Sequence, residues 1–207
     1  MSKNVLKLFC LSIVLLFVSC AHEKIEAPSF EGRDVREVLS EKNRISEIET
    51  KFSIVFEKKD SEIRGDGALD IASAGDMSLR VYSLGFLAME VTSKEGTVKS
   101  TPHLDRNKTE ILTRGLRDCL FWWDLKDFAV QEDDGCYLLK NPEREIWIDK
   151  RTLLPKRQRI YFEEGKYLNV YYDDPAVEND VWYQSKIRIE LAKYTVTLFV
   201  KNMLFKI

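Results

Sequence analysis

Most of the chain after residue 50 alternates apolar and polar positions with a period of two, which is typical of strands that bury one face. Polar or glycine-containing segments at 57–61, 73–76 and 94–96 separate the first of these runs, and short turns between consecutive strands favour an antiparallel meander. The alternation predicts about eleven strands, at 52–56, 63–71, 77–81, 87–91, 128–130, 137–139, 146–148, 158–162, 168–172, 186–191 and 195–200.

Two segments instead place apolar residues at helical spacing. The first begins after Asp34, a candidate N-cap, and carries Val35, Val38, Leu39, Ile45 and Ile48. The second extends from about residue 104 to 124 and carries Ile111, Leu112, Leu116, Leu120 and Trp123, with Gly115 as a local weak point. The sequence therefore predicts two amphipathic helices in a mainly β protein.

So many antiparallel strands either stack as a sandwich or curl toward a barrel. A helix with an apolar stripe can lie over the mouth of a curled sheet, and sandwiches usually lack such an inserted helix. We therefore predict a mainly β (α+β) fold, an unclosed antiparallel β-barrel with a helical lid. It forms one domain over 33–207, preceded at 20–32 by a tether that contains Pro28 and Gly32.

Composition and charge agree with a globular domain. The 207 residues are 44% hydrophobic and 32% charged, with 32 Lys+Arg against 34 Asp+Glu. Nine glycines and five prolines are too few for a collagen-like or low-complexity chain. The nearly balanced charge argues against nucleic acid as a partner, because phosphate binding requires a basic face.

The N-terminus is the one stretch without this balance. Lys3 and Lys7 precede thirteen uncharged residues, 8–20, which are too few to cross a bilayer core that needs about 20 helical residues. A basic region followed by a short apolar run is typical of a secretory signal. The run ends in Ser19-Cys20, which resembles a bacterial lipobox.

The lipobox resemblance implies that residues 1–19 are removed and that Cys20 is acylated and anchors the protein in a membrane. Ala21 follows the cysteine, and the absence of Asp there implies the outer membrane, with the domain facing the periplasm. The alternative is an ordinary signal peptide in which Cys20 is an incidental thiol.

Export also permits disulfides, and two other cysteines remain in the domain. Cys119 and Cys136 could form a bridge, or they could be two separate thiols, because sequence does not give their distance. His22 and His103 are the only histidines, so a Cys/His zinc site is not expected, and no cofactor or metal is predicted.

The segment 79–91, followed by Gly96-Thr97-Val98, resembles the third and fourth strands of the LolB family. The resemblance extends to the first amphipathic helix, to the helix around 116–122 and to the closing strand at 195–205. LolB proteins are outer-membrane receptors that accept lipoproteins from the periplasmic carrier LolA. The resemblance implies an unclosed barrel whose helical lid covers a hydrophobic cavity for acyl chains.

Two sets of residues follow as candidate sites. Acyl chains need only an apolar concavity, and the candidate lining residues are Phe52, Ile54, Phe56, Leu79, Val81, Leu87 and Met89 from strands, with Leu116, Leu120 and Trp123 from the lid. The alternative is that these side chains simply pack against one another. By resemblance, Leu84, Gly85 and Phe86 match the loop through which LolB delivers lipoproteins to the membrane, although here the connection is shorter and lacks the usual proline. An ordinary strand pair with a bulge is the other interpretation.

An enzymatic function is not predicted, because the chain has no Gly-x-Ser-x-Gly, His-Glu-x-x-His or phosphate-binding loop motif. Three functions remain open. The first is a monomeric receptor that accepts lipoproteins from a LolA-like carrier and inserts them into the outer membrane. The second is a general lipid-binding or envelope-assembly lipoprotein, and the third is a structural lipoprotein with a fully packed barrel.

Overall fold

The computed structural model describes residues 25–30, 32–59, 61–162 and 165–207. The predicted signal segment, Cys20 and His22 lie outside these ranges. The strands are β1 (Glu47–Lys58), β2 (Ser61–Ala72), β3 (Met77–Ser83), β4 (Phe86–Lys94), β5 (Thr97–Thr101), β6 (Ala129–Asp133), β7 (Cys136–Lys140), β8 (Arg144–Asp149), β9 (Pro155–Tyr161), β10 (Tyr167–Glu178), β11 (Val181–Leu191) and β12 (Tyr194–Lys206).

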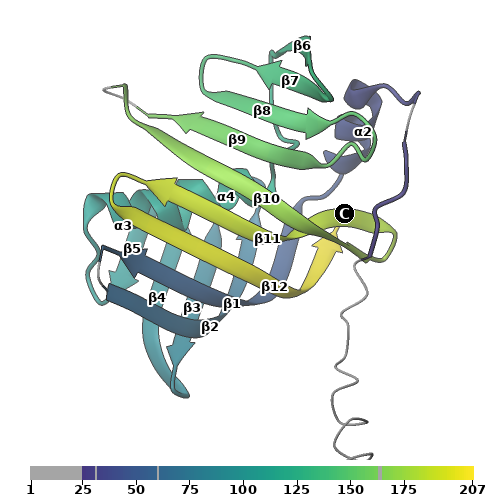
Figure 1. Ribbon diagram of the computed structural model, residues 1–207. Coiled ribbons are helices and arrows are strands. Elements are labelled where there is room, and N and C mark those ends of the chain that lie inside the picture. The colour runs from purple at the N-terminus through teal and green to yellow at the C-terminus, as the bar shows by residue number, and fades with distance from the viewer. Residues whose placement is uncertain (1–24, 31, 60, 163–164) are drawn as a thin grey trace, which may run out of the picture.

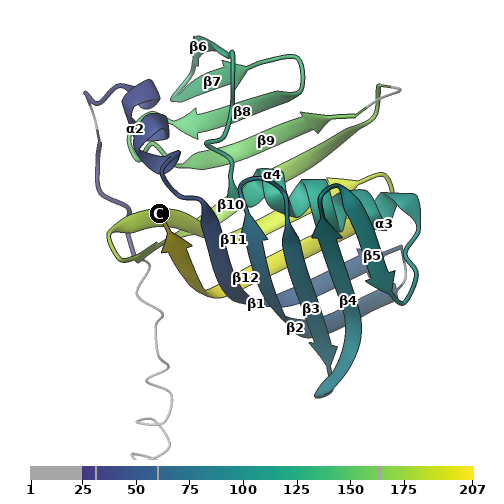
Figure 2. The same ribbon diagram turned by 180° about the vertical axis from the view of Figure 1, so that it is seen from behind.

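All twelve strands belong to one antiparallel sheet in the order β5-β4-β3-β2-β1-β12-β11-β10-β9-β8-β7-β6. Sequential hairpins account for the order except at the centre, where the first and last strands pair from Glu47 with Lys206 to Lys58 with Tyr194. The sheet curls strongly, and β5 and β6 remain as its two free edges within the described chain (Figures 1 and 2). The predicted unclosed antiparallel barrel is confirmed.

The strand that the alternation did not predict is β5. Its sequence, Thr97 to Thr101, contains only one large apolar residue, Val98, and no member of the strand is buried. It forms because Lys94-Glu95-Gly96 turns the chain back along β4, where Thr97 pairs with Lys94. Backbone pairing alone therefore defines this edge strand, and a pattern of burial could not have identified it.

The first predicted helix is shorter than expected. Helix α2 spans Val35–Lys42, and Asp34 caps it by accepting a hydrogen bond from the Arg36 backbone N–H at 2.9 Å. Ile45 and Ile48 lie beyond its end, and Ile48 is fully buried on β1. The prediction that the helix continues through Ile48 is wrong, because pairing of β1 with both β2 and β12 draws this segment into the sheet.

The second helix is one helical run of three pieces, α3 (Arg106–Glu110), a π-helical turn at Ile111–Gly115 and α4 (Leu116–Leu120). It lies between the two sides of the curled sheet (Figure 1). A Cβ built on Gly115 would lie 3.0 Å from Leu168 Cδ1 on β10, so glycine allows the helix to approach the sheet closely here. No described helix is long and apolar enough to cross a membrane.

The start of the described chain is docked on the domain. Ala27 is 4% exposed, and its carbonyl accepts a hydrogen bond from Arg151 Nη1 at 3.2 Å. The Phe30 backbone N–H in turn donates to the Arg151 carbonyl at 2.6 Å. The segment predicted as a tether is therefore held against the loop between β8 and β9 over its second half.

Candidate functional site

Seven of the ten predicted lining residues are buried where the helical run packs against the sheet. Phe52, Ile54, Leu79 and Val81 come from the sheet, and Leu116, Leu120 and Trp123 come from α4 and the turn after it. Phe56 and Met89 are half-buried and pack against the same core. The structure therefore brings these nine residues together on the concave side, and their contact with a ligand stays a prediction.

Leu87 is the exception, because 53% of it is exposed. Strand β4 has a bulge opposite Val81 and Tyr82, where Val81 pairs with Met89 but Tyr82 pairs with Leu87. Adjacent residues on β3 thus face residues two apart on β4, and the bulge changes which face each side chain occupies. The prediction that Leu87 faces inward with Met89 is wrong, since strict alternation does not continue through a bulge.

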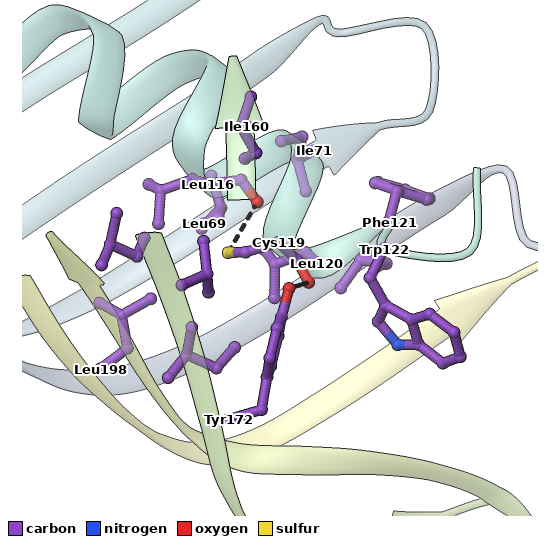
Figure 3. Packing of buried hydrophobic residues seen from close by; sticks show 14 of the residues in the cluster. Leu69, Ile71, Leu116, Cys119, Leu120, Phe121, Trp122, Ile160, Tyr172 and Leu198 are labelled. Atoms are coloured by element: carbon purple, nitrogen blue, oxygen red, sulfur yellow. Dashed lines mark hydrogen bonds between the residues drawn. The ribbon is translucent and has the colours of Figure 1, made fainter. Parts of the chain in front are cut away.

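The space between the helix and the sheet is filled. Figure 3 shows Leu116 and Leu120 of α4 with Cys119, Phe121 and Trp122, against sheet residues that include Tyr172 and Leu198. A pocket between α4 and the sheet has a volume of about 10 Å³ and is lined by Leu120, Trp123, Tyr172, Ile187 and Met203 among others. This volume is at the lower limit for one water molecule, so an acyl chain could enter only if the helical run moved.

Three polar contacts hold the helical run on the sheet. Tyr194 Oη donates to Asp105 Oδ2 at 3.0 Å, at the N-terminal end of the run. At the other end, Arg117 Nε and Nη2 donate to the Ser73 carbonyl at 3.1 and 2.6 Å. Close to Arg117 in the same helix, the Cys119 carbonyl lies 3.1 Å from the buried Tyr172 hydroxyl, which lies 2.6 Å from Gln158 Oε1. Burial raises the pKa of Tyr172, which keeps this hydroxyl a neutral donor.

A buried cluster of charges lies under the same helix. Asp118 is 6% exposed, and its carboxylate lies 2.8 Å from Arg117 Nη1 and 3.8 Å from Nη1 of Arg144 on β8, which is 5% exposed. Arg114 adds a contact at 3.6 Å, and Asp124 pairs with Arg117. Sequence reasoning missed this cluster, although the charged pair Arg117-Asp118 inside an apolar run was a signal for it.

The two cysteines of the domain are free thiols. Cys119 is buried in α4, where its Sγ lies 3.2 Å from the Leu116 carbonyl, and Cys136 is half-buried at the start of β7. Of the two alternatives from the sequence, the structure has the separate thiols. Burial raises the pKa of the Cys119 thiol strongly and that of Cys136 as well, so neither thiol is activated.

We expect iodoacetamide to modify Cys136 slowly in the native protein at pH 8 and Cys119 only after unfolding. Iodoacetamide cannot reach the buried Cys119 in the folded domain. Burial also raises the pKa of the Cys119 thiol, and only the thiolate is reactive. Peptide mass mapping after timed labelling measures both sites, with labelling in urea as the control. Equal native rates at the two cysteines would contradict the burial of Cys119.

The connection between β3 and β4 is a two-residue turn that ends in exposed apolar side chains. Leu84 and Gly85 have φ values of 51° and 83°, as a type I′ hairpin turn requires. Leu84 is 95% exposed and Phe86 is 77% exposed. The hairpin extends beyond the ends of the neighbouring strands at the bottom of Figure 2.

Leucine is unfavourable at this position in two ways. A bulky side chain is strained at positive φ, where asparagine or glycine is preferred. An exposed leucine also gains nothing from burial in the folded domain. Neither local conformation nor packing explains Leu84, and a contact outside the domain would.

Comparison with known proteins gives the fold a family context. No family model matches the sequence, and no curated protein matches it. Among solved structures, a DUF1329 family protein from Desulfovibrio piger superposes with a TM-score of 0.58 at 12% identity, over 84% of this chain and 91% of that one.

Two further solved structures are similar to this chain. A LolA superfamily protein from Nitrosomonas europaea has a TM-score of 0.55 at 10% identity, over 85% of this chain and 95% of that one. An outer membrane lipoprotein-sorting protein domain from Vibrio parahaemolyticus has a TM-score of 0.50 at 12% identity, over 83% of this chain and 92% of that one. At these identities the likeness concerns the fold alone, which is a LolA-like unclosed antiparallel sheet.

Proposed function

We propose that this protein binds the acyl chains of lipids or lipoproteins on the concave side of its sheet, beneath the helical run 106–120. The observation that carries the proposal is an apolar helix lying over the apolar face of a sheet with two free edges. Such an arrangement can exchange helix–sheet contacts for ligand contacts without breaking the backbone pairing of the sheet. The similarity in fold to a LolA superfamily protein and to an outer membrane lipoprotein-sorting protein domain supports the same function.

The filled interior corresponds in this proposal to the closed form. An entering chain takes the places of Leu116, Leu120 and Trp123, and burial of its methylene groups returns about 25 cal/mol per Å². The polar contacts of Asp105, Arg117, Asp118 and Cys119 with the rest of the domain must break for this movement. The three-piece helical run, with its π-helical turn, is a suitable element for such a movement because π-bulges often mark functional sites.

We further propose that the protein acts at the outer membrane. Acylation of Cys20 anchors the protein in the outer membrane, a LolA-like periplasmic carrier supplies the lipoprotein, and the Leu84 hairpin makes the apolar contact with the bilayer during delivery. The exposed Leu84 and Phe86 support this last step. Binding of lipids without transfer is the narrower form of the same function.

Mass spectrometry of copurified lipids tests the binding step. The full chain with Cys20→Ser, which removes the acylated thiol, is purified without detergent and extracted. We expect acyl lipid at a molar ratio near one and, with a photoreactive fatty acid, crosslinks to residues 112–123. A preparation free of lipid that also fails to take up added lipid would contradict the proposal.

The filled interior itself favours a second candidate function, a structural envelope protein that binds a partner through its surface. The same experiment separates the two. A packed barrel leaves the extract empty and the crosslinks absent, whereas an acyl-binding protein produces both.

Replacing Leu84 with asparagine is expected to reduce lipoprotein transfer to vesicles at least about tenfold while keeping or slightly raising thermal stability. Asparagine suits the positive φ of 51° better than leucine does, so the turn survives while the apolar contact is lost. Transfer from a loaded carrier is measured against Ser93→Asn on the same strand pair. Undiminished transfer by the Leu84 variant would exclude this hairpin from delivery.

A further inference from the structure

A second pocket lies beside helix α2. Helix α2, the loop after β8 and the turn between β10 and β11 enclose a volume of about 300 Å³. Most of its lining is apolar and comes from Phe30, Val38, Ile45, Leu153, Leu154 and Val181. The volume is at the lower end of the range of about 300–1,000 Å³ for small-molecule sites.

Arg33, Lys42 and Arg44 also line the pocket, and of these cations Lys42 lies against indole rings. Lys42 Nζ donates to the Trp182 carbonyl at 2.9 Å and lies 5.1 Å from the ring centre of Trp123 and 5.8 Å from that of Trp122. An ammonium group carries three donors, and this single carbonyl accounts for one of them. The indole rings attract the charge through their faces but accept no proton.

The carboxylates near this pocket do not neutralise Lys42. Glu41 is next in sequence, but its Oε1 accepts a hydrogen bond from Arg33 Nη2 at 2.7 Å. Asp180 also lines the pocket, and within the described chain neither it nor any other carboxylate forms an ion pair with Lys42. Burial lowers the pKa of Lys42 to about 8, although the charge of the neighbouring Glu41 opposes this shift.

We infer that this pocket binds a single-chain fatty carboxylate, with its head group on Lys42 and its chain along the apolar lining from Val38 to Leu154. Charge complementarity indicates that the head group of the ligand is a carboxylate, because a carboxylate supplies a hydrogen-bond acceptor for the Lys42 ammonium. The pocket volume indicates a ligand with one acyl chain, since about 300 Å³ is too small for the several chains of a lipoprotein or phospholipid. The site borders the concave side at Trp123, but its lining of Phe30, Val38, Leu153 and Leu154 is distinct from the residues proposed there, and the inference does not rest on the function proposed for the concave side.

Quenching of tryptophan emission by a brominated decanoate tests the inference. Bromine quenches at short range, and Trp122, Trp123 and Trp182 all surround Lys42. In the full chain with Cys20→Ser we expect saturable quenching. Lys42→Met keeps the aliphatic stem and should weaken the binding of decanoate at least about tenfold, the effect of one charge-assisted hydrogen bond. Brominated decanol should bind both proteins equally.

Two further variants complete the test. Lys51→Met removes an exposed lysine of β1 and should leave decanoate binding unchanged. Val181→Phe narrows the pocket while keeping Lys42, and should weaken the binding of both decanoate and decanol. Melting curves confirm that each variant folds. Equal affinity for decanoate and decanol in the parent protein, or decanoate binding unaffected by both Lys42→Met and Val181→Phe, would overturn the inference.

Discussion

Replacing Trp123 with alanine is expected to lower the free energy of unfolding by about 3–5 kcal/mol, the usual cost of truncating a buried aromatic residue. Trp123 is 2% exposed and stands edge-on to Phe121 at 5.7 Å and to Trp122 at 5.6 Å between ring centres. Its removal leaves a cavity between the helical run and the sheet that these neighbours cannot fill. Urea denaturation followed by circular dichroism measures the loss.

Trp147 provides the matched control for this truncation. It is half-buried on the outward face of β8, where Arg157 and Arg159 lie 5.0 and 6.0 Å from its ring. Trp147→Ala should cost about 1 kcal/mol or a little more, because mainly cation–π and partial apolar contacts are lost. Similar losses for both variants would mean that Trp123 does not occupy a closed core.

The new cavity also connects stability with the proposed function. Apolar cavities made by truncation stay dry and accept apolar ligands of suitable shape. An acyl ligand should therefore restore part of the stability that Trp123→Ala removes, and restore none in Trp147→Ala. The midpoint of urea unfolding with and without added fatty acid reports this difference.

The second large effect is expected at Asp118. Asp118→Asn removes the one carboxylate that Arg114, Arg117 and Arg144 share, and Arg144 is itself 5% exposed. Leaving a buried cation without its partner costs about 3–5 kcal/mol. Burial already lowers the pKa of the Arg144 guanidinium, while the charge of Asp118 opposes that shift. Urea denaturation at pH 7 measures the cost.

An exposed ion pair supplies the comparison. Glu37 lies 3.9 Å from Arg33 on the solvent side of α2, and Glu37→Gln should cost less than about 1 kcal/mol. A double variant, Asp118→Asn with Arg144→Met, should recover part of the loss, since the unpaired buried cation is gone. Additive losses in the double variant would show that the two residues do not interact.

The sequence was sufficient for the class of fold because one-sided burial repeats so regularly along these strands. It was insufficient wherever backbone pairing, rather than burial, determined structure. Strand β5 forms with no buried residue, and the segment around Ile48 joins β1 although its spacing also suits a helix. Leu87 faces outward because a bulge shifts the register between Leu87 and Met89, and such a bulge has no signature in the apolar pattern.

The candidate site was predictable only in its apolar part. Burial of Leu79 or Leu116 follows from periodicity, but periodicity does not distinguish a lining residue from a packed one. The contacts that hold the helix on the sheet join residues far apart in the chain, such as Asp105 with Tyr194 and Asp118 with Arg144. No local pattern reports such pairs, and only the folded chain brings them together.

The docking of Ala27 and Phe30 on Arg151 sets the reach of the domain from a membrane. With the proposed anchor at Cys20, six residues lie between the lipidated cysteine and the docked Ala27, and these seven steps of the chain span at most about 25 Å. A free tether through Gly32 would have allowed about 43 Å. The domain would thus work close to the bilayer with a restricted orientation, and the contacts of Arg151 would decide which of its sides meets the lipid.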